Sequence, residues 1–126
     1  MVFDSDILVW HLRGYLRATS FMEAEAAREM SVVTYMELLR GVRDKEELRK
    51  LKSFLAEFSF RMLPLSESIG HRAAIYMEQF SLKIAMSVPD ALLAATAAEH
   101  GLPLATGNTK HFPPMDGLDL RPFSPR

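Results

Sequence analysis

Residues 2–16 read VFDSDILVWHLRGYL, which is a short apolar run, a polar turn and an apolar stretch with helical spacing. Val2 and Phe3 are interpreted as a short buried strand, and Asp4 follows that strand at the turn. Across residues 7–16 the apolar side chains recur at the intervals of a helix. This strand–turn–helix unit predicts an α/β fold if the same pattern repeats along the chain.

The pattern repeats. Further strands are predicted at residues 31–33, 60–65, 102–106 and 118–121, and further helices at residues 23–30, 34–41, 44–58, 66–84 and 89–98. Strands that alternate with helices favour a parallel sheet covered on both faces. The sequence therefore predicts a three-layer α/β fold, with a central parallel sheet of four to five short strands flanked by helices.

Length and composition limit the classes of protein. The 126 residues suit a single domain that spans residues 1–126. Cysteine is absent, which excludes a disulfide framework and a thiolate metal site and favours a cytoplasmic location. No apolar run approaches the ~20 residues that a membrane helix needs, and the start MVFDSD does not resemble a signal peptide, so we expect no membrane association.

The net charge of −1 comes from 15 basic and 16 acidic residues. Many nucleic-acid-binding domains are strongly basic, so a nucleic-acid site in this chain would have to rest on a local patch or on bound metal ions. A charge near zero also promotes association, which favours a chain that has a protein partner.

Three acidic residues occupy comparable places in the predicted fold. Asp4 follows the first strand, Glu37 lies in the helix after the second, and Asp90 opens the buried helix before the fourth. Ligands of open α/β sheets bind at the carboxyl ends of the strands, so these carboxylates are expected to meet there. A shared Mg²⁺ or Mn²⁺ ion would relieve their repulsion and activate water for attack on a phosphate.

Each acid also has a purely structural interpretation. Thr34 and Glu37 have the spacing of a capping box, and Asp90 lies where a helix dipole favours negative charge. Asp4 or Asp6 is a suitable N-cap for the first helix. For any one acid alone the structural interpretation is the stronger, and only the three together favour a metal site.

Four segments together resemble the PIN-domain family. They are DSDILV at residues 4–9, SVVTYMELLRG at residues 31–41, PDALLAATA at residues 89–97 and HGLPLATGNTKHF at residues 100–112. The segments come in the family's order and cover nearly the whole chain. The resemblance is closest to the VapC-like toxins of type II toxin–antitoxin systems.

The resemblance implies a metal-dependent endoribonuclease that hydrolyses RNA phosphodiester bonds with Mg²⁺ or Mn²⁺ and leaves 5′-phosphate and 3′-hydroxyl ends. It makes Asp4, Glu37 and Asp90 the catalytic, metal-binding acids. Further polar residues would hold the Asp4 carboxylate or line the crevice; these are Ser5, Asp6, Thr106, Asn108 and His111.

His111 departs from the family's pattern, in which many members carry a fourth acid just before the closing Phe. Imidazole is a poorer ligand for Mg²⁺ than a carboxylate is. His111 therefore implies either that a second metal ion is weakly held or that this side chain contacts the substrate phosphate.

The resemblance also implies partners, namely an RNA substrate (tRNA, rRNA or mRNA), a cognate antitoxin that places a helix or an extended tail in the crevice, and a second copy in a homodimer. Basic residues near the crevice in sequence are candidates for RNA contacts; these are Arg13, Arg17, Arg40, Arg43 and Lys110. By contrast, His11 beside Trp10 is interpreted as a packed side chain.

Two other functions were compared with this one. A PIN-like binding module that has lost catalysis would act only through its partner, and His111 is the feature that favours it. A phosphoacceptor receiver domain has a similar length but needs an Asp after its third strand, where this chain has Pro64, Leu65, Ser66 and Glu67. The receiver interpretation is therefore set aside.

Overall fold

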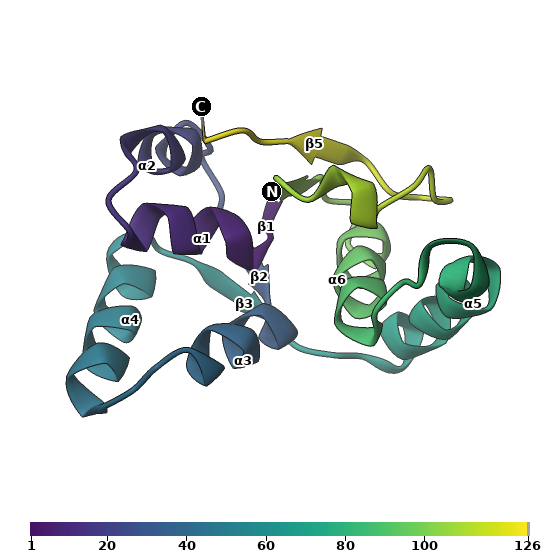
Figure 1. Ribbon diagram of the computed structural model, residues 1–126, viewed down its shortest axis with the longest axis horizontal. Helices are drawn as coiled ribbons and strands as arrows, with labels where there is room; N and C mark the ends of the chain where they lie inside the picture. The colour runs from purple at the N-terminus through teal and green to yellow at the C-terminus, as the bar shows by residue number, and fades with distance from the viewer. Residues whose placement is uncertain (126) are drawn as a thin grey trace.

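In the computed structural model, which describes residues 1–125, one parallel sheet runs through the centre of the molecule (Figure 1). Its strands are β1 (Val2–Phe3), β2 (Glu29–Ser31), β3 (Arg61–Leu63), β4 (Leu104–Thr106) and β5 (Leu120–Pro122). They lie in the order β3-β2-β1-β4-β5, and every neighbouring pair is parallel. The predicted α/β class and parallel sheet are confirmed.

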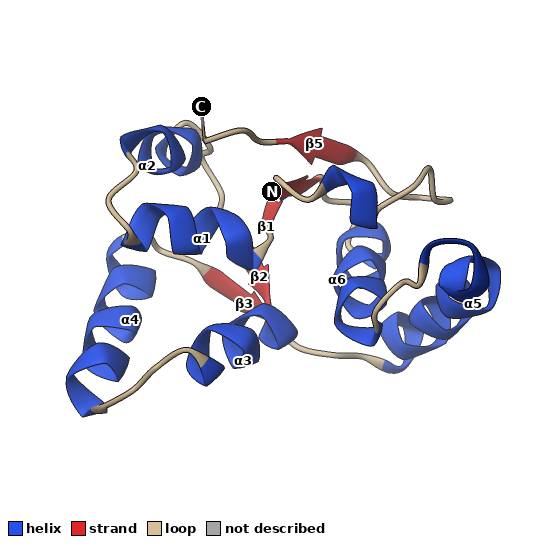
Figure 2. Ribbon diagram, in the orientation of Figure 1, coloured by secondary structure: helices blue, strands red, loops and turns tan. Residues whose placement is uncertain are grey.

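Helices cover both faces of this sheet (Figure 2). They are α1 (Ser5–Leu12), α2 (Leu16–Glu23), α3 (Val32–Arg40), α4 (Lys45–Glu57), α5 (Glu67–Ile84) and α6 (Val88–Glu99), with a short 3₁₀ helix, η1, at Thr109–His111. One hydrophobic core joins the sheet to α1–α4, and a second core joins it to α5 and α6. Among residues 1–125, no helix is both long and apolar enough to cross a membrane.

The central strand β1 contributes to both cores because successive side chains of a strand point to opposite faces. Val2 packs with α5 and α6, whereas Phe3 packs with α1–α4, and both side chains are fully buried. The Phe3 ring makes edge contacts with Phe21 and Phe60, at centroid distances of 5.9 and 5.8 Å. The position of β1, and of the residue that follows it, is therefore fixed from both sides.

The helix predicted at residues 23–30 is wrong, because Glu23 ends α2 and residues 29–31 form β2. Arg28 ends the helical run by donating hydrogen bonds to the carbonyl oxygens of Met22, Glu25 and Phe58. Glu29 is buried against the terminal ammonium group of Met1, at 2.6 Å. These tertiary contacts outweigh the helix propensity of the segment EAEAAREM.

The strand predicted at residues 31–33 is displaced by two residues, and α3 consequently begins at Val32 rather than at Thr34. Ser31 is the N-cap of α3, since its side chain accepts a hydrogen bond from the Val33 N–H at 3.1 Å. Thr34 Oγ1 is buried and has no hydrogen-bond partner within the described residues. The proposed capping box of Thr34 and Glu37 is therefore wrong, and Glu37 does not serve the helix cap.

The helix predicted at residues 7–16 is divided in two. The first part, α1, ends at Leu12, and α2 begins at Leu16. Gly14 between them has a φ of +90°, a conformation that glycine adopts at little steric cost. The remaining strands are shorter than predicted or shifted, because only residues 61–63, 104–106 and 120–122 pair with neighbours.

The strand order places a topological switch point at the carboxyl end of β1. From β1 the chain passes to β2 and β3 on one side, and after α5 and α6 it returns to β4 on the other side. Such a switch point is where open α/β sheets bind ligands. Asp4 directly follows β1 and Thr106 ends β4, so both lie at this point.

Replacing the cap of α3 should cost stability, whereas replacing Thr34 should not. We expect Ser31→Ala to lower the free energy of unfolding by about 1 kcal/mol, because the Val33 N–H loses its partner. Thr34→Val removes a buried hydroxyl without a partner and should leave this energy unchanged or raise it. Urea denaturation measures both, and a larger loss for Thr34→Val than for Ser31→Ala would contradict the assignment of the cap.

Candidate active site

Asp4 is a buried carboxylate that is held by residues of α1 and β4. It is the N-cap of α1, and its Oδ1 accepts hydrogen bonds from the N–H and the hydroxyl of Ser5, at 2.7 and 3.4 Å. Its Oδ2 accepts a hydrogen bond from Thr106 Oγ1 at 2.8 Å. Burial raises the pKa of Asp4 and the charge of Asp90 adds to the rise, although the hydrogen bonds from Thr106 and Ser5 oppose it.

Glu37 lies on α3 and is within electrostatic range of the other two acids. Its pKa is raised first by burial and then by the charges of Asp4 and Asp90, while Arg40 lowers it. The side chain remains partly exposed to solvent. Asp4 after β1, Glu37 on α3 and Asp90 on α6 thus lie within electrostatic range of one another.

Asp90 lies in the first turn of α6, where the helix dipole favours its charge. The N-cap of this helix is Ser87, whose side chain accepts a hydrogen bond from the Asp90 N–H at 3.2 Å. The Asp90 carboxylate does not serve as the cap. Its Oδ2 lies 3.1 Å from His111 Nδ1, which places the departure from the family pattern directly beside one of the three acids.

Asp6 contacts the turn after β4 rather than Asp4. Its Oδ2 accepts a hydrogen bond from the Gly107 N–H at 2.8 Å. Burial, followed by the charge of Asp4, raises the pKa of Asp6 to about 6. Its Oδ1 is buried and has no hydrogen-bond partner of ordinary geometry among residues 1–125, although the N–H groups of Ile7 and Asp6 lie near enough to favour the charged form. Asp6 and Gly107 are 101 residues apart, so no local sequence pattern predicts this contact.

The other polar residues that were expected to line the site, Asn108 and His111, lie in the segment that follows β4, together with Lys110. Asn108 contributes its backbone N–H, which donates to Thr106 Oγ1 at 3.0 Å, while its side chain is exposed. Lys110 and His111 lie on η1 and are both exposed. Thr106 and His111 thus each touch one of the three acids.

The basic residues proposed for RNA contacts occupy different surroundings. Arg40 is close enough to Glu37 to lower its pKa, and Lys110 is adjacent to His111 in sequence. Arg43 instead forms an ion pair with Glu47 at 2.8 Å. The Arg13 guanidinium lies 5.8 Å from the centre of the Trp10 ring. Arg17 is exposed on α2.

His11 is packed, as predicted. Its ring stacks on Phe54 at a centroid distance of 4.6 Å, and its Nδ1 lies 2.6 Å from Thr19 Oγ1. Burial lowers the pKa of His11. These contacts give it a role in the core of α1, α2 and α4.

A groove of about 520 Å³ leads away from the acids between α1, α3 and α4. Ser5 and Glu37 lie at the acidic site and also line this groove. The rest of its lining is mainly apolar with a few charges; it consists of Val9, Leu12, Arg13, Leu38, Gly41, Val42, Glu47, Lys50 and Leu51.

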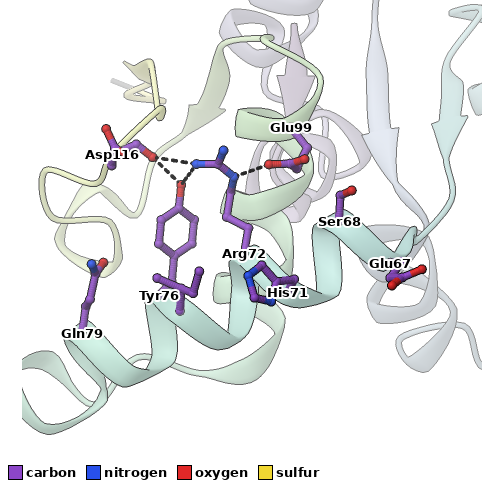
Figure 3. Close-up of a pocket in the computed structure, with 9 residues that line it drawn as sticks. Glu67, Ser68, His71, Arg72, Tyr76, Gln79, Glu99 and Asp116 are labelled. Carbon is purple, nitrogen blue, oxygen red and sulfur yellow. Dashed lines mark hydrogen bonds and ion pairs between the residues drawn. The ribbon is translucent and has the colours of Figure 1, made fainter.

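A second hollow, of about 740 Å³, lies along α5, and its lining includes none of the three acids (Figure 3). In it, Tyr76 donates a hydrogen bond to the Asp116 carbonyl oxygen at 2.6 Å, and Arg72 pairs with Glu99. Arg72 also donates to the same carbonyl oxygen, at 3.3 Å. These contacts fasten the segment around Asp116 onto α5 and α6, which is a structural role.

The donor atoms of the acidic site fit a hard divalent cation, because carboxylate oxygens suit Mg²⁺ and Mn²⁺. Burial is the main cause of the raised pKa values of Asp4 and Glu37, and the neighbouring acids add to it. The spacing of the three carboxylates is wider than that of a preformed centre. Among residues 1–125, no three His, Asp or Glu side chains lie close enough together to hold a metal ion. A bound cation would have to draw the three carboxylates closer together.

Comparison with known proteins identifies the family. The PIN domain family profile matches residues 1–117. Over 119 residues the chain is 37% identical to "Ribonuclease VapC10" of Mycobacterium tuberculosis, a match that covers 91% of this chain and 87% of the relative. Over 126 residues it is 29% identical to "Ribonuclease VapC1" of Rickettsia felis, with 95% and 93% covered.

Solved structures with a similar fold include chains from toxin–antitoxin complexes. A toxin–antitoxin complex from Klebsiella pneumoniae contains a similar chain, with a TM-score of 0.77 and 28% identity over 99% of this chain and 97% of that one. VapBC2 from Rickettsia felis, bound to a DNA fragment from its promoter, shares the fold, with a TM-score of 0.76 and 22% identity over 98% and 100% of the two chains. The chain belongs to the PIN-domain family and, within that family, to the VapC-like proteins.

The raised pKa of Asp6 predicts a specific dependence of stability on pH. Because the pKa of Asp6 in the folded protein lies above the ordinary value of 3.8, protonation of Asp6 stabilises the fold fully below about pH 4, and this stabilisation is lost as the pH rises through about 6. Relative to Asp6→Asn, the wild type should lose about 1–2 kcal/mol of unfolding free energy between pH 4 and pH 7, after allowance for solvent screening. Urea denaturation in EDTA measures this difference, and identical pH profiles for the two proteins would contradict it.

Proposed function

We propose that the chain is a metal-dependent endoribonuclease that acts in the cytoplasm as the toxin of a toxin–antitoxin pair. The observation that carries this proposal is the buried Asp4 carboxylate, which Ser5 and Thr106 hold at the switch point of the sheet with Glu37 and Asp90 within electrostatic range of it. The names of the VapC relatives support the ribonuclease activity. The oxygen donors of the three acids support Mg²⁺ or Mn²⁺ as the cofactor.

In this proposal Asp4, Glu37 and Asp90 would hold the divalent ion, and the bound ion would supply Lewis-acid chemistry that activates water and neutralises charge on the scissile phosphate. Ser5 and Thr106 fix the orientation of the Asp4 carboxylate through their hydrogen bonds. Glu37 is the most exposed of the three acids and orients the attacking water. Hydrolysis by water needs neither a covalent enzyme intermediate nor the ribose 2′-hydroxyl.

The substrate backbone is proposed to bind between cations on two sides of the acids. Arg40 lies near Glu37, and Lys110 lies beside His111, which contacts Asp90. Positive side chains at these positions attract phosphates toward an otherwise acidic edge. Arg43 is a weaker candidate, since its guanidinium group is already paired with Glu47.

Asp90→Asn tests catalysis. The variant should cleave single-stranded RNA at least roughly 100-fold more slowly, which exceeds the typical effect of removing an outer-shell contact. Its stability should be unchanged or higher, because one of three repelling charges is removed and the N-cap at Ser87 is kept. Cleavage of a fluorescent RNA and thermal unfolding measure the two quantities.

The cofactor is tested on the same proteins. At about 100 times its dissociation constant, Mg²⁺ or Mn²⁺ should add about 2.7 kcal/mol to the unfolding free energy of the wild type but little to that of Asp4→Asn. EDTA should abolish cleavage. If the wild type binds its partner but does not cleave RNA with either metal, the catalytically impaired binding module becomes the better description.

We further propose that the cognate antitoxin occupies the groove between α1, α3 and α4, and that the chain also forms a homodimer. The groove is mainly apolar and shares Ser5 and Glu37 with the acidic site, so a helix or tail seated in it would block access to the acids. Similarity to chains from toxin–antitoxin complexes supports a partner of this kind.

Leu12→Glu tests this partner site, because Leu12 lines the groove and is 50% exposed, so that its replacement should not disturb the core. We expect binding of the purified antitoxin to weaken at least about tenfold, since a charge replaces an apolar contact. Leu82→Glu is the matched control, because Leu82 is 99% exposed and lies outside the groove. Equal affinities for the Leu12 and Leu82 variants, measured by calorimetry, would contradict the proposed site.

A further inference from the structure

Asp6 joins two segments that are far apart in the sequence. It lies in the first turn of α1, and its Oδ2 accepts the Gly107 N–H, 101 residues further along the chain. Gly107 is the residue after β4, in the same turn that carries Thr106 and Asn108. The contact therefore fastens the carboxyl end of β4 to the start of α1.

We propose that Asp6 is a positioning residue of the acidic site, which acts on Asp4 through the turn that follows β4. This inference rests on the proposed function, because it names what fixes one of the three acids. It specifies how Asp6, which was expected to help hold the Asp4 carboxylate or to line the crevice, acts on that carboxylate through the residues that follow β4.

The connection from Asp6 to Asp4 runs through hydrogen bonds. Asp6 fixes the peptide N–H of Gly107 in the middle of the turn. The next N–H, of Asn108, donates to Thr106 Oγ1 at 3.0 Å. Because that oxygen accepts from Asn108, its own hydrogen is directed to Asp4 Oδ2, at 2.8 Å. The turn thereby sets the direction of the only side-chain hydrogen bond to Oδ2 that the described residues provide.

The turn is clamped from its other side by β5. The Phe123 N–H donates to the Thr106 carbonyl oxygen at 2.9 Å. A Cβ atom on Gly107 would lie 2.6 Å from Asp6 Oδ2 and 3.3 Å from the Phe123 carbonyl oxygen. Any larger residue at position 107 must therefore displace the Asp6 carboxylate, which makes Gly107→Ala a second way to break the contact.

The contact needs an acceptor at position 6 but not a charge. Asp6→Asn keeps an acceptor oxygen and removes the charge, whereas Asp6→Ala removes both. Gly107→Ala keeps the charge and breaks the hydrogen bond. These three variants separate the positioning effect of Asp6 from its electrostatic attraction for a cation.

Mn²⁺ affinity, measured by calorimetry on the full chain without RNA, is the first readout. Asp6→Ala and Gly107→Ala should each weaken Mn²⁺ binding about tenfold, in the range found for residues that orient metal ligands. Asp6→Asn should stay within about threefold of the wild type. The double variant with both Asp6→Ala and Gly107→Ala should bind Mn²⁺ no more weakly than either single variant, because both changes break the same contact.

Two control variants should leave Mn²⁺ binding unchanged. Asp119→Ala removes an exposed carboxylate that is paired with Arg121. Gly70→Ala places a Cβ on a helical glycine with nothing within 4 Å. The second readout is the metal-free amide NMR spectrum, in which the Thr106, Gly107 and Asn108 signals should shift in Asp6→Ala and in Gly107→Ala but far less in Asp6→Asn.

Three outcomes would overturn the inference. They are an Asp6→Asn variant that binds Mn²⁺ as weakly as Asp6→Ala, additive losses in the double variant, or unshifted signals from residues 106–108 in Asp6→Ala. If Asp6→Ala does not fold, Asp6→Asn and Gly107→Ala decide the same question. Failure of the proposed function is seen separately, as equal Mn²⁺ binding by the wild type and Asp4→Asn.

Discussion

The hydrogen bond from Thr106 Oγ1 to Asp4 Oδ2 joins the ends of β4 and β1, which are 102 residues apart in the chain. It satisfies one oxygen of a carboxylate that is only 4% exposed. Burial of an ionised group without such partners is costly, so the pairing of β1 with β4 and the placement of this acid depend on each other. The Asp4 carboxylate is thus fixed by the same contacts that define the switch point of the sheet.

Around this fixed acid the molecule gathers charges that repel. Asp6, Glu37 and Asp90 all lie within electrostatic range of Asp4, and Asp4, Asp6 and Glu37 have raised pKa values. A protein gains no stability from such a cluster, and perturbed acids of this kind are typical of functional sites. A bound divalent cation would turn the same repulsion into attraction and would in turn attract the phosphates of a nucleic acid, which is why these acids favour a nuclease over a purely structural arrangement.

The sequence predicted the fold well because periodicity and order carry that information. Strand–helix alternation predicted the parallel sheet that the structure has. The positions of Asp4, Glu37 and Asp90 beside predicted elements led to the prediction that their carboxylates share one site, and the structure places them within electrostatic range of one another. Local propensity failed at residues 23–30, where contacts of Arg28 and Glu29 with distant backbone and charge override it. The capping box at Thr34 failed because Ser31, three residues earlier, already caps α3. Asp6 contacts Gly107 after β4, and His111 contacts Asp90 on α6. Both partners are distant in the sequence, so no local pattern identifies them.

A crystal of this chain soaked in Mn²⁺ would test the central claim most directly, through the anomalous scattering of the ion. The account predicts a peak within coordination distance of the Asp4 carboxylate and of at least one of Glu37 and Asp90, with those side chains drawn inward. A peak elsewhere, or no peak at a concentration that saturates Mn²⁺ binding in solution, would contradict it.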